Sequence, residues 1–162
     1  MVTTPAEYRN NLWQIQTNSF PRKAVLPYAE RIYNVDLKTR IIESPEFLSV
    51  AKDHKAESIY FSTQRYVDYM DLSQTACVIQ YKLEDGTMGL YPVPFYDITS
   101  QNEFGSERII FPWLLDGLAT AKSGIIEYSI RFFRVSDGAD KRFIYNLNTI
   151  PAKSKILYGM DV

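Results

Sequence analysis

The stretch GIIEYSIRFF, residues 124–133, alternates apolar and polar side chains more strictly than any other part of the chain. Successive side chains of a β-strand point to opposite faces, so this pattern predicts a strand with one face in a hydrophobic core. The expected buried face comprises Ile126, Tyr128, Ile130 and Phe132, and the opposite face comprises Glu127, Ser129, Arg131 and Phe133.

Shorter alternations lie on both sides of this stretch, separated by polar turns. Aromatic residues make up 14% of the chain, and strands favour aromatic and β-branched side chains. About seven or eight short strands, spaced by roughly 8 to 12 residues, are typical of an all-β sandwich or barrel. We therefore predict an antiparallel β-sandwich of jelly-roll or immunoglobulin-like type, with strands that include 31–42, 58–63, 77–83, 88–96, 107–113, 124–133 and 142–147. A less regular stretch, 47–56, is interpreted as a short strand followed by a loop.

The tetrapeptide EDGT, residues 84–87, holds an Asp-Gly pair between two of these predicted strands. Asp-Gly supplies the positive φ that tight hairpin turns need, so residues 77–83 should pair directly with residues 88–96. Pro92 and Pro94 stand two residues apart in the second strand and remove N–H donors from one side of it. We expect this strand at a sheet edge or a bulged rim.

Residues 1–30 contain three prolines and no glycine. Proline lacks an N–H donor and restricts the residue before it to extended conformations, so we predict an extended N-terminal arm followed by a sandwich domain at 31–162. The apolar side chains of the arm need a covering surface, which is either a partner protein or the body of the same domain. An arm that is simply the first strand of the sandwich is an equally open alternative. The candidates for partner binding are Leu12, Trp13, Ile15, Phe20 and Tyr28.

The charges of the chain are balanced. Lys and Arg number 18 against 19 Asp and Glu, so no positive field attracts the phosphate backbone of nucleic acid. One cysteine, Cys77, and one histidine, His54, are too few for a disulfide framework or a structural zinc site. The chain begins without a secretory signal and holds no apolar span of about 18 residues, so we expect a soluble protein with no membrane partner.

No motif of a known catalytic loop is found. The 7 glycines are scattered, so neither a nucleophile elbow nor a phosphate-binding loop can be assembled from them. Cys77 begins an apolar alternation and is interpreted as a core residue. We therefore predict no catalytic residue, no metal site and no cofactor. Tyrosine combines apolar area with a polar tip, and possible surface recognition is assigned to Tyr66, Tyr69, Tyr91 and Tyr96.

The order of several short motifs resembles a family of phage virion proteins. The motifs are FLSV at 47–50, ESIYF at 57–61, MDLS at 70–73, IIFPW at 109–113, the stretch 124–133, LNT at 147–149 and ILYGMD at 156–161. Their order and spacing are similar to those of the N-terminal domain of phage baseplate upper proteins and related fibre-base proteins. On this resemblance Trp113 fills the core, 71–73 forms a turn and Gly124 allows a tight entry into the long strand.

The resemblance implies a non-enzymatic virion structural protein that is made in the host cytoplasm. Such a protein is an adaptor or fibre-base component of the tail, baseplate or head. It docks on a hub protein, has other virion proteins as partners and self-associates as a homo-oligomer. One alternative is a jelly-roll carbohydrate-binding module that recognises host surface glycans. Another is a small hydrolase with an unrecognised pair of carboxylates.

Overall fold

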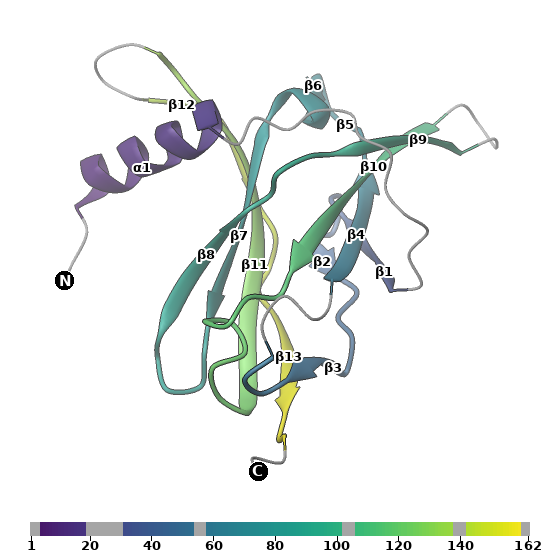
Figure 1. The fold of residues 1–162 in the computed structure, drawn as a ribbon. Helices are drawn as coiled ribbons and strands as arrows, with labels where there is room; N and C mark the ends of the chain where they lie inside the picture. The colour runs from purple at the N-terminus through teal and green to yellow at the C-terminus, as the bar shows by residue number, and fades with distance from the viewer. Residues whose placement is uncertain (1–3, 19–30, 54–57, 102–105, 138–141, 160–162) are drawn as a thin grey trace.

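A computed structural model describes residues 4–18, 31–53, 58–101, 106–137 and 142–159 (Figure 1). Within these ranges an N-terminal helix is followed by strands and one short 3₁₀ turn. The helix is α1 (Pro5–Asn18) and the 3₁₀ turn is η1 (Leu72–Gln74). The strands are β1 (Ile32–Asp36), β2 (Ile41–Ile42), β3 (Phe47–Val50), β4 (Ser58–Gln64), β5 (Tyr66–Val67), β6 (Met70–Asp71), β7 (Ala76–Lys82), β8 (Met88–Pro92), β9 (Asp97–Gln101), β10 (Ser106–Leu114), β11 (Gly124–Val135), β12 (Phe143–Asn148) and β13 (Ala152–Leu157).

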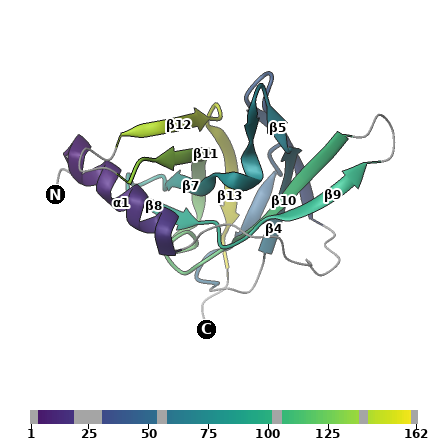
Figure 2. The ribbon, with the colours of Figure 1, turned by 90° about the horizontal axis from the view of Figure 1, so that it is seen from above.

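Two sheets face each other and enclose the core (Figure 2). The first sheet has the order β2-β1-β4-β10-β9. The second has the order β3-β13-β11-β7-β8, and β12 also pairs with β11. The prediction of a mainly β domain is confirmed, including the short strand expected within 47–56. The jelly-roll or immunoglobulin-like type stays a prediction.

Two strand pairs are parallel, β1 with β4 and β3 with β13. The prediction of an exclusively antiparallel sandwich is therefore wrong. Side chains alternate with a period of two in both kinds of sheet, so the sequence pattern that locates a strand does not give the direction of its partner.

Aromatic side chains from the two sheets meet in the core. The ring centroids of Trp113 on β10 and Tyr128 on β11 are 5.2 Å apart, and those of Phe111 and Phe132 are 5.7 Å apart. Ring pairs at such distances stabilise a protein by about 0.5 to 1.5 kcal/mol beyond the burial of their area. The four side chains expected on the buried face of β11 are all in this core, and Trp113 fills it as the family resemblance implied.

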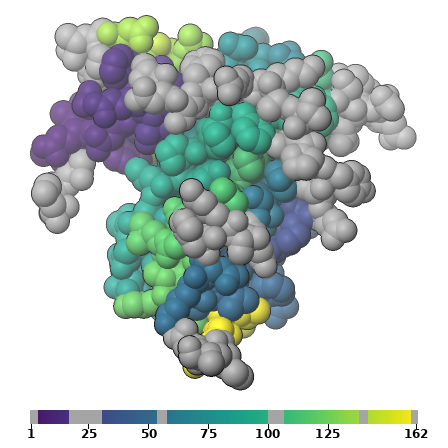
Figure 3. Space-filling model, in the orientation of Figure 1, coloured from purple at the N-terminus to yellow at the C-terminus, as the bar shows by residue number. Residues whose placement is uncertain are grey.

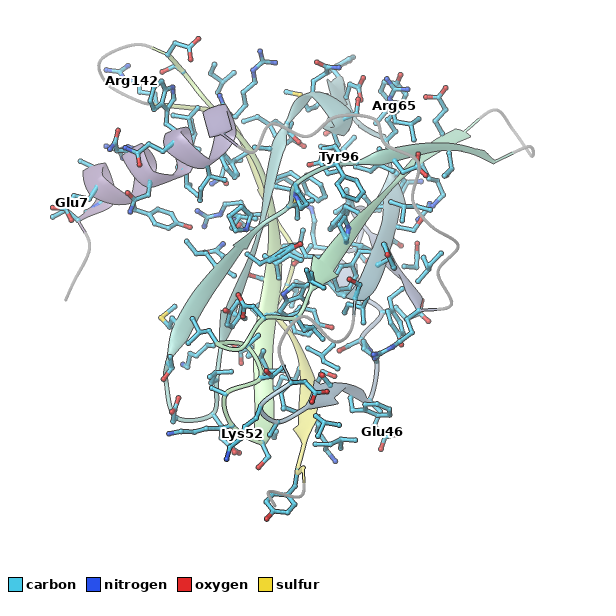
Figure 4. The ribbon with its side chains drawn as sticks, viewed as in Figure 1. Glu7, Glu46, Lys52, Arg65, Tyr96 and Arg142 are labelled. Carbon is cyan, nitrogen blue, oxygen red and sulfur yellow. The ribbon has the colours of Figure 1, made fainter. Side chains whose placement is uncertain are left out.

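Tyr96 also belongs to the core, so its assignment to surface recognition is wrong. Its ring centroid lies 5.9 Å from that of Phe111, and Figure 4 shows the side chain between the two sheets. The reason lies in the segment after β8, where the N–H of Val93 donates to the carbonyl of Cys77. This bond keeps the chain against β7 after the strand itself has ended, and Val93 and Tyr96 both turn inward.

The hairpin between β7 and β8 forms as predicted. The N–H of Leu83 donates to the carbonyl of Thr87 over 2.8 Å, and Gly86 has a φ of +92°. β8 pairs with β7 from Met88 to Pro92 and lies at the edge of its sheet. The edge position that the prolines predicted is thus confirmed.

The single strand predicted at 31–42 is wrong, because a turn divides it into β1 and β2. An oxygen of the Asp36 carboxylate accepts the N–H of Lys38 over 2.9 Å, a local bond that favours a turn. Arg40 then takes a left-handed φ of 66°, and the chain reverses so that Ile41 pairs with Asp36.

The extended arm predicted for residues 1–30 is wrong over Pro5–Asn18, which is helical. Pro5 occupies the first helical position, where an N–H would have no intrahelical partner. The N–H of Glu7 donates to the Thr4 hydroxyl over 3.1 Å, and the Glu7 carboxylate accepts the N–H of Thr4 over 3.4 Å. This reciprocal capping box stabilises the start of the helix, the end at which Figure 4 labels Glu7. Residues 19–30 lie outside the described residues.

Alkaline pH tests the burial of Tyr128. Burial raises the pKa of Tyr128 to about 12, whereas an unfolded tyrosine has a pKa of about 10. Between these values the unfolded chain releases the phenol proton and the folded chain keeps it. The contribution of Tyr128 to the free energy of unfolding is therefore fully present below about pH 10 and is lost as the pH rises toward 12. We expect Tyr128→Phe to make the free energy of unfolding fall less steeply over this range, as measured by denaturant titration. The exposed control Tyr158→Phe should fall like the wild type, and an unchanged slope in Tyr128→Phe would contradict this assignment.

Candidate interaction surfaces

Helix α1 packs on the outer face of the second sheet, on the side away from the core (Figure 2). Its fully buried residue, Leu12, forms a small second hydrophobic cluster with Ala76 and Val78 of β7 and with Phe133 and Val135 of β11. Phe133 was predicted to lie opposite the buried face of its strand. It does so, and it is buried because the helix covers it.

Gln16 completes the attachment of the helix at the point on β11 that lies beyond the first residue of β7. β7 begins at Ala76, which pairs with Phe133, so β7 offers no residue opposite Val135. The side-chain amide of Gln16 takes that place: its oxygen accepts the Val135 N–H over 2.8 Å, and its nitrogen donates to the Val135 carbonyl over 3.2 Å. One glutamine thus satisfies two buried backbone groups that would otherwise lack a partner.

Tyr8 holds the first half of the helix. The guanidinium of Arg131 lies over its ring and donates to its hydroxyl over 2.7 Å, and the hydroxyl donates to the Gln80 side chain over 2.9 Å. Burial raises the pKa of Tyr8, although the charge of Arg131 opposes this effect, so the phenol stays protonated and donates. Arg131 and Gln80 face outward from β11 and β7. Tyr8, Arg131 and Gln80, which we call the clamp, therefore mark the boundary between the part of the sheet that the helix covers and the rest of this face.

The helix lies only beside the upper end of the second sheet as drawn (Figures 1 and 3), and the remaining, lower part of this outer face is called the open half. Strand register places Met88, Lys82, Glu127 and Lys153 side by side in one row across β8, β7, β11 and β13. Four exposed apolar side chains flank the charged part of this row: Met88 and Leu90 on β8, Ile125 on β11 and Leu157 on β13. The open half therefore has apolar margins and a charged centre.

A hollow of about 280 Å³ lies in the open half, next to the clamp. Its lining includes Gln80 and Ser129 from one row, Met88 and Glu127 from the next, and Pro151 before β13. A hollow of this size, on a sheet face with exposed apolar side chains, can receive a side chain from a partner protein.

A second cluster with exposed side chains surrounds the β5–β6 hairpin, far from the open half along the sheet axis (Figures 1 and 4). Arg65 donates to both oxygens of the Asp71 carboxylate, over 3.0 and 2.9 Å, and also pairs with Glu107. Burial would raise the pKa of Asp71, but the hydrogen bonds from Arg65 and Ser73 outweigh it and lower that pKa. The guanidinium held in this way lies 5.1 Å from the ring centroid of Tyr66.

Beside this hairpin is a cavity of about 390 Å³. Its lining comprises the turn between β1 and β2, the end of β4 and the β5–β6 hairpin, through Leu37, Lys38, Arg40, Gln64, Tyr66, Val67 and Asp68. The cavity joins one aromatic side chain to charged groups of both signs.

The residues proposed from the sequence have different positions. Leu12 is fully buried in its own domain, and Trp13 and Ile15 are half-buried against the same cluster. The assignment of Leu12 to partner binding is therefore wrong, because β7 and β11 of its own domain cover its side chain. The assignment of Trp13 and Ile15 stays a prediction, and Phe20 and Tyr28 lie outside the described residues. Tyr66 and Tyr69 are exposed, whereas Tyr91 is half-buried.

The sequence interpretation missed three features that organise these surfaces: Gln16, Arg65 and the N-terminal helix. Gln16 and Arg65 are polar residues whose partners are distant along the chain, so no local pattern could have identified them. The helix was detectable, because TPAE at 4–7 combines a capping Thr, Pro at the first helical position and Glu three residues after the Thr. Tyr8, Leu12 and Ile15 also follow the helical spacing of four and three residues.

Reactive chemistry is sparse in the described part of the chain. Burial raises the pKa of the Cys77 thiol well above its usual value, so it is no thiolate at neutral pH. In the described ranges, no three side chains of His, Cys, Asp or Glu gather into a group that could hold a metal ion. His54 lies outside these ranges, and no helix within them is long and apolar enough to cross a membrane.

No protein-family model matches the chain, and no curated protein does so either. Among solved structures, the N-terminal domain of phage TP901-1 ORF48 is similar with a TM-score of 0.43 and 10% sequence identity, over 80% of this chain and 98% of that one. A TM-score at this level assigns neither a fold family nor a function to this chain.

Replacing Gln16 tests the attachment of the helix. Gln16→Ala leaves the buried N–H and carbonyl of Val135 unpaired, and an unpaired buried polar group costs about 1 to 3 kcal/mol. We expect a loss of that size in the free energy of unfolding, together with faster hydrogen exchange at the Val135 amide. Asn11→Ala removes an exposed side-chain amide from the same helix and should change neither quantity. Equal exchange rates in the two variants would contradict the role of Gln16.

Thiol labelling tests the burial of Cys77. The reagent needs an exposed thiolate, so we expect labelling of the native protein only at the rate at which the surrounding strands open. Labelling by a thiol-specific reagent should be complete in denaturant and very slow in its absence, as followed by mass spectrometry. Fast labelling of the native protein at neutral pH would show that Cys77 is accessible.

Proposed function

We infer that the chain is a structural protein of a phage virion that docks onto another virion protein through the open half of the second sheet. The observation that carries this inference is the exposure of Met88, Leu90, Ile125 and Leu157 on one side of one sheet. Protein surfaces that gather large apolar side chains commonly serve as interaction sites.

The shape and charge of the open half define the partner that it fits. An apolar side chain of the partner would enter the hollow next to Met88. The rows of side chains that border the hollow would then exclude water from this contact. Lys82, Glu127 and Lys153 alternate in charge, so the partner should present the opposite order of charges. Such complementarity sets the register of docking more than its strength.

The family resemblance supports a virion role for the domain that the two sheets form. Its motifs fall in β3, β4, β10, β11 and β13, in β6 with the η1 turn, and at the end of β12, so they include strands of both sheets. They account for the core, the turn at η1 and the entry into β11, where Gly124 has a φ of +130°. On this proposal the protein is an adaptor or fibre-base component of the tail, baseplate or head, with a hub protein as partner and with self-association into a homo-oligomer.

Met88→Asp tests the docking face, because it places a charge where the proposal requires an apolar contact. Met88 is 71% exposed at a hairpin, so we expect the free energy of unfolding to change by no more than about 0.5 kcal/mol. Incorporation into particles should be lost when the variant complements a phage that lacks the gene, as measured by mass spectrometry of purified particles. The control Ile41→Lys places a charge on an exposed apolar residue of the other sheet, opposite Asp36, and should be incorporated like the wild type.

Normal incorporation of folded Met88→Asp would overturn the proposed docking face. Absence of the wild-type protein from particles would overturn the virion role itself. Light scattering on the purified wild type and Met88→Asp shows in addition whether the same face mediates self-association.

A further inference from the structure

We propose that the cavity beside Tyr66 binds a saccharide that carries an anionic group. This binding activity goes beyond docking, because the cavity lies at the β5–β6 hairpin and the β1–β2 turn, and shares no residue with the open half. Its volume of about 390 Å³ falls within the usual range of small-ligand sites, about 300 to 1,000 Å³, and suits one or two sugar rings.

The ring of Tyr66 is preorganised to stack on a ligand. Arg65 lies over the ring, and Arg65 is itself fixed by Asp71 and Glu107. Since an aromatic ring has two faces and Arg65 lies over one, the second face remains for the apolar side of a sugar ring. Tyr66 is 54% exposed and pre-positioned, so a ligand would not have to immobilise it on binding.

Charged groups around the ring are available for hydrogen bonds to a ligand. In the described part of the chain, the ammonium group of Lys38 and the carboxylate of Asp68 form no hydrogen bond and no ion pair. The guanidinium of Arg40 is held by the carbonyls of Leu37 and Asn148, over 3.1 and 3.0 Å. Arg40 is thereby fixed at the cavity wall while part of its donor set remains unused.

The combination of these groups selects the class of ligand. Two cations and one carboxylate line the cavity, which favours a ligand with one negative charge. The Gln64 amide oxygen already accepts the Leu37 N–H over 3.3 Å and the Thr63 hydroxyl over 3.1 Å, so Asp68 supplies the acceptor for ligand hydroxyl groups. Tyr66 supplies the apolar contact. A hydroxylated ring with a carboxylate or phosphate satisfies all three requirements, whereas a simple anion leaves Tyr66 unused and a neutral sugar leaves the cations unused.

The test is a titration of the full-length protein, followed by amide chemical shifts, with three probes: glucuronate, glucose and inorganic phosphate. We expect glucuronate to bind most tightly and to shift the amides of Lys38, Tyr66, Val67 and Asp68. Tyr66→Ala should weaken glucuronate binding about tenfold, since it removes the apolar contact. Lys38→Gln should bring the affinity for glucuronate close to that for glucose, since it removes a charged hydrogen bond worth about tenfold.

Tyr69→Ala is the matched control, because Tyr69 is fully exposed in the same hairpin and does not line the cavity. Its affinity for glucuronate should equal that of the wild type. The proposal is overturned if glucuronate shifts none of the cavity amides, if phosphate binds as tightly as glucuronate, or if Tyr66→Ala and Tyr69→Ala bind alike. Met88→Asp should bind glucuronate normally, so the failure of saccharide binding and the failure of docking are distinguishable.

Discussion

The contact between β11 and β10 across the core is the interaction on which the other features depend. Trp113 and Phe111 of β10 meet Tyr128 and Phe132 of β11, and this contact joins the two sheets. β11 also pairs with β7 along one edge and with β12 and β13 along the other. Its inner face therefore contributes to the core, and its outer face lies at the centre of the surface that the second sheet presents to a partner.

The outer face of β11 is divided by the helix. Toward its carboxyl end, Phe133 and Val135 are covered by Leu12 and Gln16. Toward its amino end, the same face carries Glu127 and Ile125 and has no helix over it. Tyr8 marks the boundary through its bonds to Arg131 and Gln80, so a short N-terminal helix determines how much of the sheet is left for docking.

Sequence patterns predicted those features that depend on neighbours along the chain. The buried face of β11, the β7–β8 hairpin and the edge position of β8 each follow from alternation, an Asp-Gly pair or prolines. They did not give the parallel pairing of β1 with β4, because alternation carries no direction. The helix was missed because Pro5 was weighed as a breaker rather than as a first helical residue, although Thr4 and Glu7 flank it in a capping-box spacing.

The candidate surfaces were less predictable, since each depends on contacts between distant residues. No local sequence pattern distinguishes Tyr66 from Tyr96. In the structure, however, Tyr66 lies beside an open cavity and Tyr96 is buried in the core. The difference arises from Arg65, which holds Tyr66 outside, and from the bond between Val93 and Cys77, which directs Tyr96 inside. Neither partner can be inferred from local sequence.

Lysine footprinting of intact particles tests the docking of the open half most directly. The free protein and purified particles would be acetylated under the same conditions, and the modification of each lysine would be measured by mass spectrometry. We expect Lys82 and Lys153, which lie in the open half, to be protected in particles, while Lys38 at the distant cavity reacts equally in both samples. Equal modification of all three lysines, or absence of the protein from particles, would contradict docking through this face.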